Sequence, residues 1–330
     1  MKLVAAAAAV LFLLGAGDGA VGSACVGPGR VVVGTSGNDV LRGTAGRDTI
    51  CGLGGNDVLV GLGGRDVIRG GRGVDTVSYA GMPGGVSVDL ARGRARGYSG
   101  IDVLFGIENV RGTRERDQLL GDAGPNVLAG GFGNDVLRGG GGDDRLLSGL
   151  GDNDLHGGPG DDALLASDGD DYFFTSPGDD RYVGGKGRDR VDYTASRAAV
   201  RVALGRPGSA SGDGDDVLGG IEEVVGSRLD DALAGAAGGE LLAGGAGRDR
   251  IDGGPGADTL RGADGADDLV GASGAYRVLG EEGGDVLDGG AGADEVYGQA
   301  GDDRLDGGAG IDILDGGTDV DVCLNGETLF

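Results

Sequence analysis

The sequence predicts an all-β solenoid, in which short parallel strands stack coil upon coil around a narrow apolar interior. Three observations predict this fold class. A nine-residue unit recurs 25 times, in runs of five, nine and eleven units that begin at Gly34, Gly112 and Gly226. The eighth place of the unit is apolar in all 25 copies, the sixth is Asp in 21, and the fourth is Gly in 22. A fixed short period of this kind indicates one structural unit stacked on copies of itself.

The seventh to ninth places of each unit form the predicted strand. Because side chains alternate between the two faces of a strand, the eighth residue faces inward when its neighbours face solvent. The stacked eighth residues, from Leu41 to Cys323, then form a file along the axis. Two units complete one flattened coil of 18 residues, and adjacent coils pair as parallel strands about 4.8 Å apart.

The first six places must turn the chain, and Gly at the first and fourth places is expected to supply the positive φ angles. Stacking brings the Asp of one unit close to the Asp two units later. Two carboxylates about 5 Å apart repel by roughly 3 kcal/mol at an effective dielectric constant near 20. Ca²⁺ reverses this sign, because it accepts carboxylate and carbonyl oxygens in adaptable geometry, whereas Mg²⁺ demands a stricter one. The sequence therefore predicts several Ca²⁺ ions between the turns.

Two non-repeating spacers separate the three runs of units. The 37 residues from Val77 align without a gap to those from Val191, an offset of 114 residues, which indicates that block 79–192 is duplicated as 193–306. Within the spacers, VSVDL and VRVAL alternate like strands, and IENV and IEEV resemble short apolar strands. We expect the spacers to be wider turns of the same coil and not separate domains.

The composition limits the classes of partner. The chain has 80 Gly and 7 Pro among 330 residues, no Trp, and a formal net charge of −26. Few aromatic residues argue against an ordinary globular core. The excess of acidic residues argues against nucleic acid or an anionic membrane as a partner, and it permits a cationic one.

The first 24 residues differ from the rest. A basic start, Met1-Lys2, precedes a 12-residue apolar run that is too short to span a bilayer, and small residues follow it. This pattern predicts a secretory signal peptide over residues 1–24, and therefore a secreted protein. A buried helix and a lipoprotein site at Cys25 are the alternatives. No other segment is expected to insert into a membrane.

The cysteines are consistent with secretion. Cys25 and Cys51 are close enough in sequence to form a disulfide at the amino end, which in the chain-entropy model contributes roughly 3–4 kcal/mol. Cys323 stands at an eighth place, so a buried thiol is expected, with intermolecular pairing as the alternative.

The units GGRGVDTVS, GGFGNDVLR and GGPGADTLR resemble the RTX, or haemolysin-type, calcium-binding nonapeptide G-G-x-G-x-D-x-U-x. The spacers are similar to those in the repeat domains of serralysin-type proteases, and the cysteines around the first units are similar to those of small secreted calcium-binding proteins of actinobacteria. The resemblance implies a parallel β-roll with Ca²⁺ between successive turns on both edges. Asn126, Asn153 and Glu240 should weaken their sites, and Tyr276 should abolish the two that it adjoins.

The resemblance also implies which residues bind the metal. Each sixth-place Asp would share an ion with the Asp 18 residues later, as Asp39 with Asp57, or Asp303 with Asp321. The predicted ligands are Asp39, Asp48, Asp57, Asp66, Asp75, Asp135, Asp144, Asp162, Asp171, Asp180, Asp189, Asp249, Asp258, Asp267, Asp285, Asp294, Asp303 and Asp312.

No catalytic constellation stands out. The single histidine, His156, lies at an outward place of its unit, and the periodic Asp residues are better explained as calcium ligands than as a hydrolytic pair. The sequence therefore predicts a protein that is not an enzyme. We divide it into a signal peptide (1–24), an amino-terminal cap with the first run of units (25–78), two spacer-plus-repeat blocks (79–192 and 193–324) and a tail (325–330).

Three functions are compatible with this organisation. The favoured one is a free-standing secreted calcium-binding protein with a structural or cell-surface role. An adhesin, including an ice-binding surface, would need a regular outward ladder, but the seventh place varies among Val40, Thr49, Tyr172 and Arg190. A detached accessory domain of a secreted hydrolase or epimerase is the third. The sequence leaves open whether a cell-surface or extracellular polymer is the partner.

Overall fold

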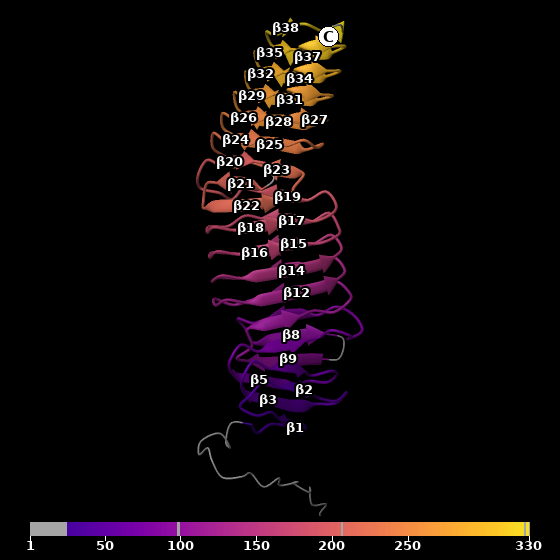
Figure 1. Ribbon diagram of the computed structural model, residues 1–330, viewed down its shortest axis with the longest axis vertical. Coiled ribbons are helices and arrows are strands. Elements are labelled where there is room, and N and C mark those ends of the chain that lie inside the picture. Colours follow the sequence, from indigo (N-terminus) through magenta and orange to yellow (C-terminus); the bar gives the residue numbers. More distant parts are fainter. Residues whose placement is uncertain (1–24, 98–99, 206, 327, 330) are drawn as a thin grey trace, which may run out of the picture.

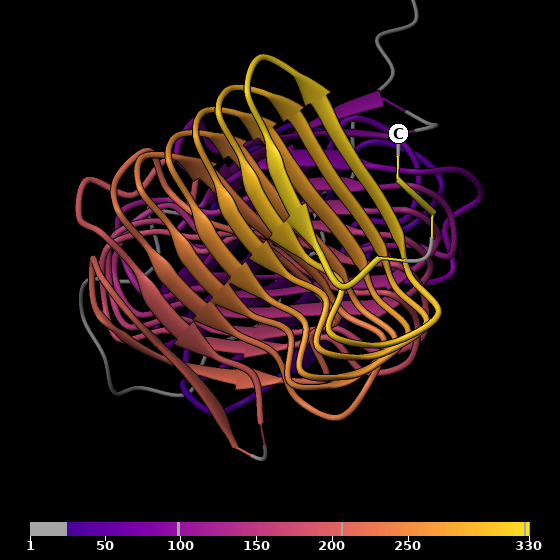
Figure 2. The ribbon, with the colours of Figure 1, turned by 90° about the horizontal axis from the view of Figure 1, so that it is seen from above.

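The computed structural model describes residues 25–97, 100–205, 207–326 and 328–329, which wind into one rod-like solenoid (Figure 1). Seen along the rod, each coil is flattened, with two broad strips of strands facing each other (Figure 2). All regular structure in these ranges is β, and they contain no helix long and apolar enough to cross a membrane. The predicted all-β solenoid is confirmed.

Two long sheets and one short sheet make up the solenoid. Sheet A pairs its strands in the spatial order β1 (Arg30–Val33), β3 (Asp48–Gly54), β5 (Val67–Arg72), β9 (Gly100–Phe105), β8 (Arg94–Gly97), β7 (Ser87–Asp89), β11 (Gln118–Leu120), β13 (Val136–Arg138), β15 (Asp154–His156), β17 (Tyr172–Phe174), β19 (Arg190–Asp192), β23 (Glu223–Val225), β25 (Leu241–Ala246), β28 (Thr259–Asp264), β31 (Arg277–Glu282), β34 (Glu295–Ala300), β37 (Ile313–Thr318) and β39 (Thr328–Leu329).

Sheet B runs along the opposite side in the order β2 (Val40–Arg42), β4 (Val58–Val60), β6 (Thr76–Ser78), β10 (Asn109–Arg111), β12 (Val127–Phe132), β14 (Arg145–Leu150), β16 (Ala163–Leu165), β18 (Arg181–Val183), β22 (Asp215–Gly219), β21 (Gly208–Ser211), β20 (Arg201–Ala203), β24 (Ala232–Ala234), β26 (Arg250–Asp252), β29 (Asp268–Val270), β32 (Val286–Asp288), β35 (Arg304–Asp306) and β38 (Val322–Leu324). Sheet C is a short edge ladder in the carboxy-terminal part, made of β27 (Pro255–Gly256), β30 (Ser273–Gly274), β33 (Ala291–Gly292) and β36 (Ala309–Gly310).

The register confirms two units per coil. Leu41 pairs in parallel with Leu59, and Ile50 with Ile68, so partners in adjacent coils are 18 residues apart. Successive units therefore alternate between sheets A and B. Several strands are six residues long instead of the three predicted, because the parallel register continues into the first places of the following unit, as from Leu241↔Thr259 to Ala246↔Asp264.

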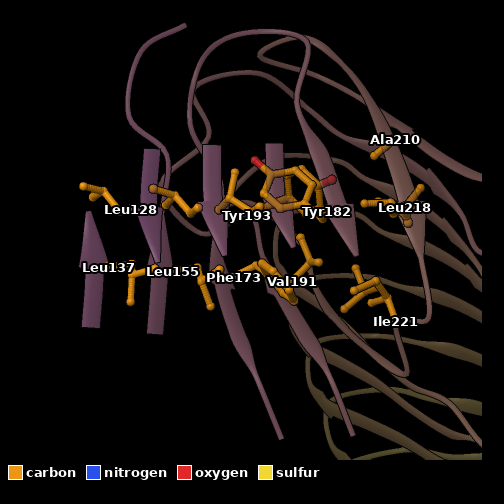
Figure 3. Close-up of a cluster of buried hydrophobic side chains, with 14 of the residues drawn as sticks. Leu128, Leu137, Leu155, Phe173, Tyr182, Val191, Tyr193, Ala210, Leu218 and Ile221 are labelled. Carbon is orange, nitrogen blue, oxygen red and sulfur yellow. The ribbon is translucent and has the colours of Figure 1, made fainter. Parts of the chain in front are cut away.

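Within the runs of units, the core consists mainly of the eighth-place side chains, as predicted. From Ile50 to Leu314 these residues are at most 3% exposed, and at the ends of the rod Leu41 and Cys323 are half-buried. The predicted single file is in fact two facing rows, one from each sheet, because alternate units lie in opposite sheets (Figure 3). Phe173 and Tyr182 meet across the rows edge to face, with ring centroids 5.8 Å apart. The interior is therefore two side chains wide.

The two spacers remain part of the coil, as expected, but each adds an antiparallel hairpin. In the first spacer, β7, β8 and β9 pair antiparallel within sheet A. In the second, β20, β21 and β22 do so within sheet B. The duplicated spacers lie in opposite sheets because an odd number of units, nine, separates them.

The disulfide expected at the amino end is present, whereas the thiol at the carboxy end is less buried than expected. Cys25 is joined to Cys51 by a disulfide, which fastens the amino-terminal segment to β3. Cys323 is a free thiol that is half-buried and packs against the last residues of the core. The predicted signal peptide, residues 1–24, lies outside the described residues.

The two-row core predicts unequal effects of truncating neighbouring leucines. Leu146 on β14 is 0% exposed, whereas Leu147 points outward and is half-buried. In calcium-containing buffer, Leu146→Ala should lower the free energy of unfolding by about 2–5 kcal/mol, because it leaves a cavity in the row. Leu147→Ala should cost much less. Guanidinium unfolding followed by circular dichroism checks this, and equal midpoints for the two variants would contradict the assignment.

Candidate metal centre

The turns of the solenoid need glycine at the first and fourth places, as predicted, but of these two only the fourth-place Gly supplies a positive φ angle. Positive φ angles fall at the second and fourth places, for example at Leu53 (81°) and Gly55 (96°), and not at the first. The first-place Gly is required for space. A Cβ on Gly52 would stand 2.0 Å from Asp57 Oδ2 and 2.5 Å from the carbonyl oxygen of Gly70. The expectation that the first Gly supplies positive φ is therefore wrong, and its role is to let oxygens approach.

The sixth-place Asp residues form hydrogen-bonded ladders along each edge. The backbone N–H of Asp39 donates to Asp57 Oδ1 at 2.8 Å, and the N–H of Asp57 donates to Asp75 Oδ1 at 2.8 Å. Each bond joins residues 18 apart in the sequence, so the structure brings together the predicted neighbours on successive coils. Beyond the first coil, one oxygen of each of these carboxylates is thereby used.

The second oxygen of most of these carboxylates has no hydrogen-bond partner, although it is buried. In the repeat pattern it faces the carbonyl of the next coil: Asp57 Oδ2 and Gly70 O lie within about 4.5 Å of one another, since both stand close to the Cβ position of Gly52. The residues with such an unpartnered Oδ2 are Asp57, Asp66, Asp75, Asp135, Asp144, Asp162, Asp171, Asp189, Asp249, Asp258, Asp267, Asp285, Asp294 and Asp303. All fourteen belong to the predicted ligand set.

The other predicted ligands are placed differently. Asp39 and Asp48 accept the hydroxyls of Thr35 and Thr44, each at 2.9 Å, on Oδ2. Asp180 Oδ2 accepts the hydroxyl of Tyr182 at 2.7 Å. Asp312 is buried on the last coil, where its Oδ1 accepts the N–H of Asp294 at 3.0 Å.

Burial dominates the electrostatics of the row. It raises the pKa of Asp66, Asp162 and Asp249 to about 7, opposed by the backbone N–H bond and reinforced by neighbouring carboxylates. Desolvation and like charge both disfavour the ionised form. Without a cation, therefore, these carboxyls resist ionisation.

Hydroxyl groups of the chain donate hydrogen bonds to carboxylates in the spacers and at the start of each run of units. The hydroxyls of Tyr79 and Tyr193 donate to Oδ2 of Asp102 and Asp216, at 3.1 and 3.0 Å. Thr113 and Ser227 donate twice to the Asp four residues later, with the hydroxyl to Oδ1 at 3.0 and 2.9 Å and with the backbone N–H to Oδ2. These turns need no external partner for the oxygen concerned.

The substituted sixth places change the donor set. Asn126 offers a neutral amide oxygen in the same position, 2.2 Å from the Cβ point of Gly121. Tyr276 is 2% exposed, and its ring lies 2.7 and 3.0 Å from the Cβ points of Gly253 and Gly271 while its hydroxyl donates to the Gly254 carbonyl. The tyrosine thus fills the space that the carboxylate and carbonyl share elsewhere.

Four acidic residues of this system were not identified from the sequence. The N–H of Asp66 donates to Asp102 Oδ1 at 2.9 Å, and that of Asp75 to Glu108 Oε2 at 2.7 Å. The second block repeats the arrangement with the carboxylates of Asp216 and Glu222. A signal existed: residues 97–105, GYSGIDVLF, have Gly, Gly, Asp and Leu at the first, fourth, sixth and eighth places.

A cation between two turns would draw on backbone as well as side-chain oxygens. Within the ranges that the structure describes, no three His, Cys, Asp or Glu side chains come together as a metal cluster. Most repeat turns offer a buried carboxylate oxygen, a converging carbonyl and the carboxylate of the next coil. Hard oxygens in a flexible number are the ligands that Ca²⁺ prefers, so the residues present fit this ion.

A second ladder at the fifth place lies on the surface and is satisfied by itself. The N–H of Asp161 donates to Asp143 Oδ1 at 3.1 Å, and that of Asp179 to Asp161 Oδ1 at 2.9 Å. These side chains are exposed and do not share the buried position of the sixth-place row.

Comparison with known families agrees with this geometry. The family model described as the RTX calcium-binding nonapeptide repeat matches residues 31–59, 52–81, 120–155, 156–191, 234–269, 243–278 and 279–314, which together make up more than half of the chain. A search of curated proteins found no match. The matched ranges omit 82–119 and 192–233, although the coil continues through both.

The raised pKa values predict how the metal-free protein responds to pH. Asp66 and Asp162 have a pKa of about 7 in the fold and an ordinary value of 3.8. Folding therefore takes up protons, so the stability of the metal-free fold is greatest below about pH 4 and falls as the pH rises through 7. Circular dichroism in metal-depleted buffers should show more β signal at pH 5 than at pH 8. A signal that rises with pH would contradict the assignment.

The hydrogen bonds from tyrosine to the spacer carboxylates predict that removing one hydroxyl destabilises the fold. Tyr193→Phe leaves Asp216 Oδ2 buried without its donor, which should lower the free energy of unfolding by about 1–3 kcal/mol. Tyr297→Phe is the control, because its hydroxyl reaches Glu295 only at 3.4 Å on the exposed side. Chemical unfolding at saturating calcium checks this, and equal losses would count against the closure.

Proposed function

The chain belongs to the RTX calcium-binding nonapeptide repeat family, and from this premise we propose that it is a secreted structural protein whose folding depends on Ca²⁺. The observation that carries the proposal is the row of buried carboxylate oxygens without a partner, most of which face a carbonyl of the next coil. Burying an unpaired charge is costly, and an ion bound only by the folded state stabilises that state.

Each chain element has a defined task in this proposal. A sixth-place carboxylate such as Asp144 would bind the ion with its Oδ2, while its Oδ1 stays on the N–H of Asn126 at 2.7 Å. The first-place Gly139 leaves the room in which that oxygen and the Gly157 carbonyl converge, at 2.1 and 2.6 Å from its Cβ point. The bound ion supplies positive charge between the coils, and the apolar rows fix the distance between the sheets.

Secretion is supported by two features. The first 24 residues have the pattern of a signal peptide, and a disulfide joins Cys25 to Cys51, which suits an oxidising compartment. Extracellular fluid is also where calcium is abundant enough for weak sites to fill.

The proposed role is structural and not catalytic. The acidic residues form a periodic row in place of an isolated pair. His156, the single histidine, packs face to face on Phe174 with ring centroids 3.8 Å apart, and burial lowers its pKa to about 4. A rod at the cell surface or among extracellular polymers is the setting that we propose for such a molecule.

A calcium titration of the metal-stripped mature chain tests the proposal. Circular dichroism should show β signal rising with Ca²⁺ and much less with Mg²⁺ at equal concentration. Asp144→Asn should move the Ca²⁺ midpoint upward, because it removes a charged buried ligand. Asp143→Asn is the matched control, since Asp143 is exposed and lies in the fifth-place ladder. If Ca²⁺ gives no gain in β signal, the proposed function is wrong.

A further inference from the structure

The turn that closes each spacer is shorter than a repeat turn and carries Glu where the repeats carry Asp. The bond from the N–H of Asp66 reaches Asp102, 36 residues later, whereas the bond from Asp75 reaches Glu108, 33 residues later. The closing turn has therefore lost three residues relative to two whole coils. Glutamate is one methylene longer than aspartate, so its carboxylate still reaches the N–H of Asp75 at 2.7 Å.

A glycine carbonyl takes part in the same turn. Gly106 O lies 2.0 Å, and Asp75 Oδ2 2.3 Å, from the Cβ point of Gly70, so these two oxygens converge as they do in the repeats. Gly106 has a φ of 56°, a left-handed conformation that suits glycine and directs this carbonyl in the shortened turn.

The second spacer reproduces the arrangement 114 residues later. The N–H of Asp189 donates to Glu222 Oε2 at 3.0 Å. Asp189 Oδ2 and Gly220 O each lie 2.2 Å from the Cβ point of Gly184, and Gly220 has a φ of 63°.

The charge at both turns is not compensated by the protein. Asp75 and Asp189 are 0% exposed, and their Oδ2 atoms have no hydrogen-bond partner. Among the described residues, no arginine or lysine forms an ion pair with these two aspartates or with Glu108 and Glu222. The neighbouring spacer carboxylates differ, because Tyr79 and Tyr193 supply hydroxyls to Asp102 and Asp216.

We propose that each of these turns is a Ca²⁺ site of its own, formed by the carboxylates of Asp75 and Glu108 with the Gly106 carbonyl, and again by Asp189, Glu222 and the Gly220 carbonyl. The inference rests on the proposed function. Both glutamates and both glycines fall outside the residues that the family model matches. The two sites continue the row of calcium sites into the spacers. Each spacer is thereby joined through an ion to the run of units before it.

Counting bound ions tests this inference. Native mass spectrometry of the calcium-saturated mature chain should show two fewer Ca²⁺ ions in Glu108→Gln/Glu222→Gln than in the wild type. The control is Glu115→Gln/Glu223→Gln, since Glu115 is exposed and Glu223 pairs with Arg188 on the surface. The control should keep the wild-type number.

The outcomes separate the two proposals. A double variant that keeps the wild-type number of ions overturns this inference alone, whereas a wild-type chain that binds no Ca²⁺ overturns the proposed function. If the variant does not fold, anomalous diffraction from calcium-grown crystals of the wild type decides. A peak between Asp75 and Glu108 supports the site, and its absence there with peaks at the repeats overturns it.

Discussion

The structure depends on one electrostatic constraint: carboxylates buried at regular intervals along the rod must each find positive charge or a hydrogen-bond donor. Desolvation raises the free energy of every ionised Asp in the row, and coils 18 residues apart bring the next Asp near it. The ladder of N–H donors satisfies one oxygen of each carboxylate beyond the first coil. The other oxygen determines how the coil behaves, because it is either closed by the chain or left for an ion.

The chain uses both solutions in different places. The second oxygen of the first carboxylate in each run of units accepts the hydroxyl of Thr35 or the backbone N–H of Thr113 or Ser227. In the spacers, the hydroxyls of Tyr79 and Tyr193 donate to Asp102 and Asp216. Within the runs the second oxygen is mostly unpartnered. The solenoid is therefore divided into stretches in which the second carboxylate oxygen has no donor from the protein and shorter stretches that provide their own donors. Apolar burial alone, only two side chains wide, would hold such glycine-rich coils poorly.

The sequence was sufficient to predict the coil and most of the candidate site because a strict period of nine fixes both. The residues of the site that do not follow this period were missed. The hairpins are not a multiple of nine residues long, so the count is lost at Ser78 and resumes at Gly112, and Asp102 and Glu108 fall in between. The hydroxyl of Tyr193 meets Asp216, 23 residues away, through a fold that no local pattern describes. The first-place Gly was misassigned because a missing Cβ can serve either backbone conformation or close approach, and the sequence does not distinguish them.

The placement of the two hairpins in opposite sheets determines what happens when such a protein gains or loses repeat units. Each nonapeptide advances the chain by half a revolution, so the parity of the units between the spacers decides on which side the second hairpin emerges. Losing or gaining a single unit from the middle run would turn everything beyond it over by half a revolution, while a change of two units would only shift it along the axis. Whether an insertion or deletion contains an odd or an even number of units therefore decides which side of the rod the later surfaces face.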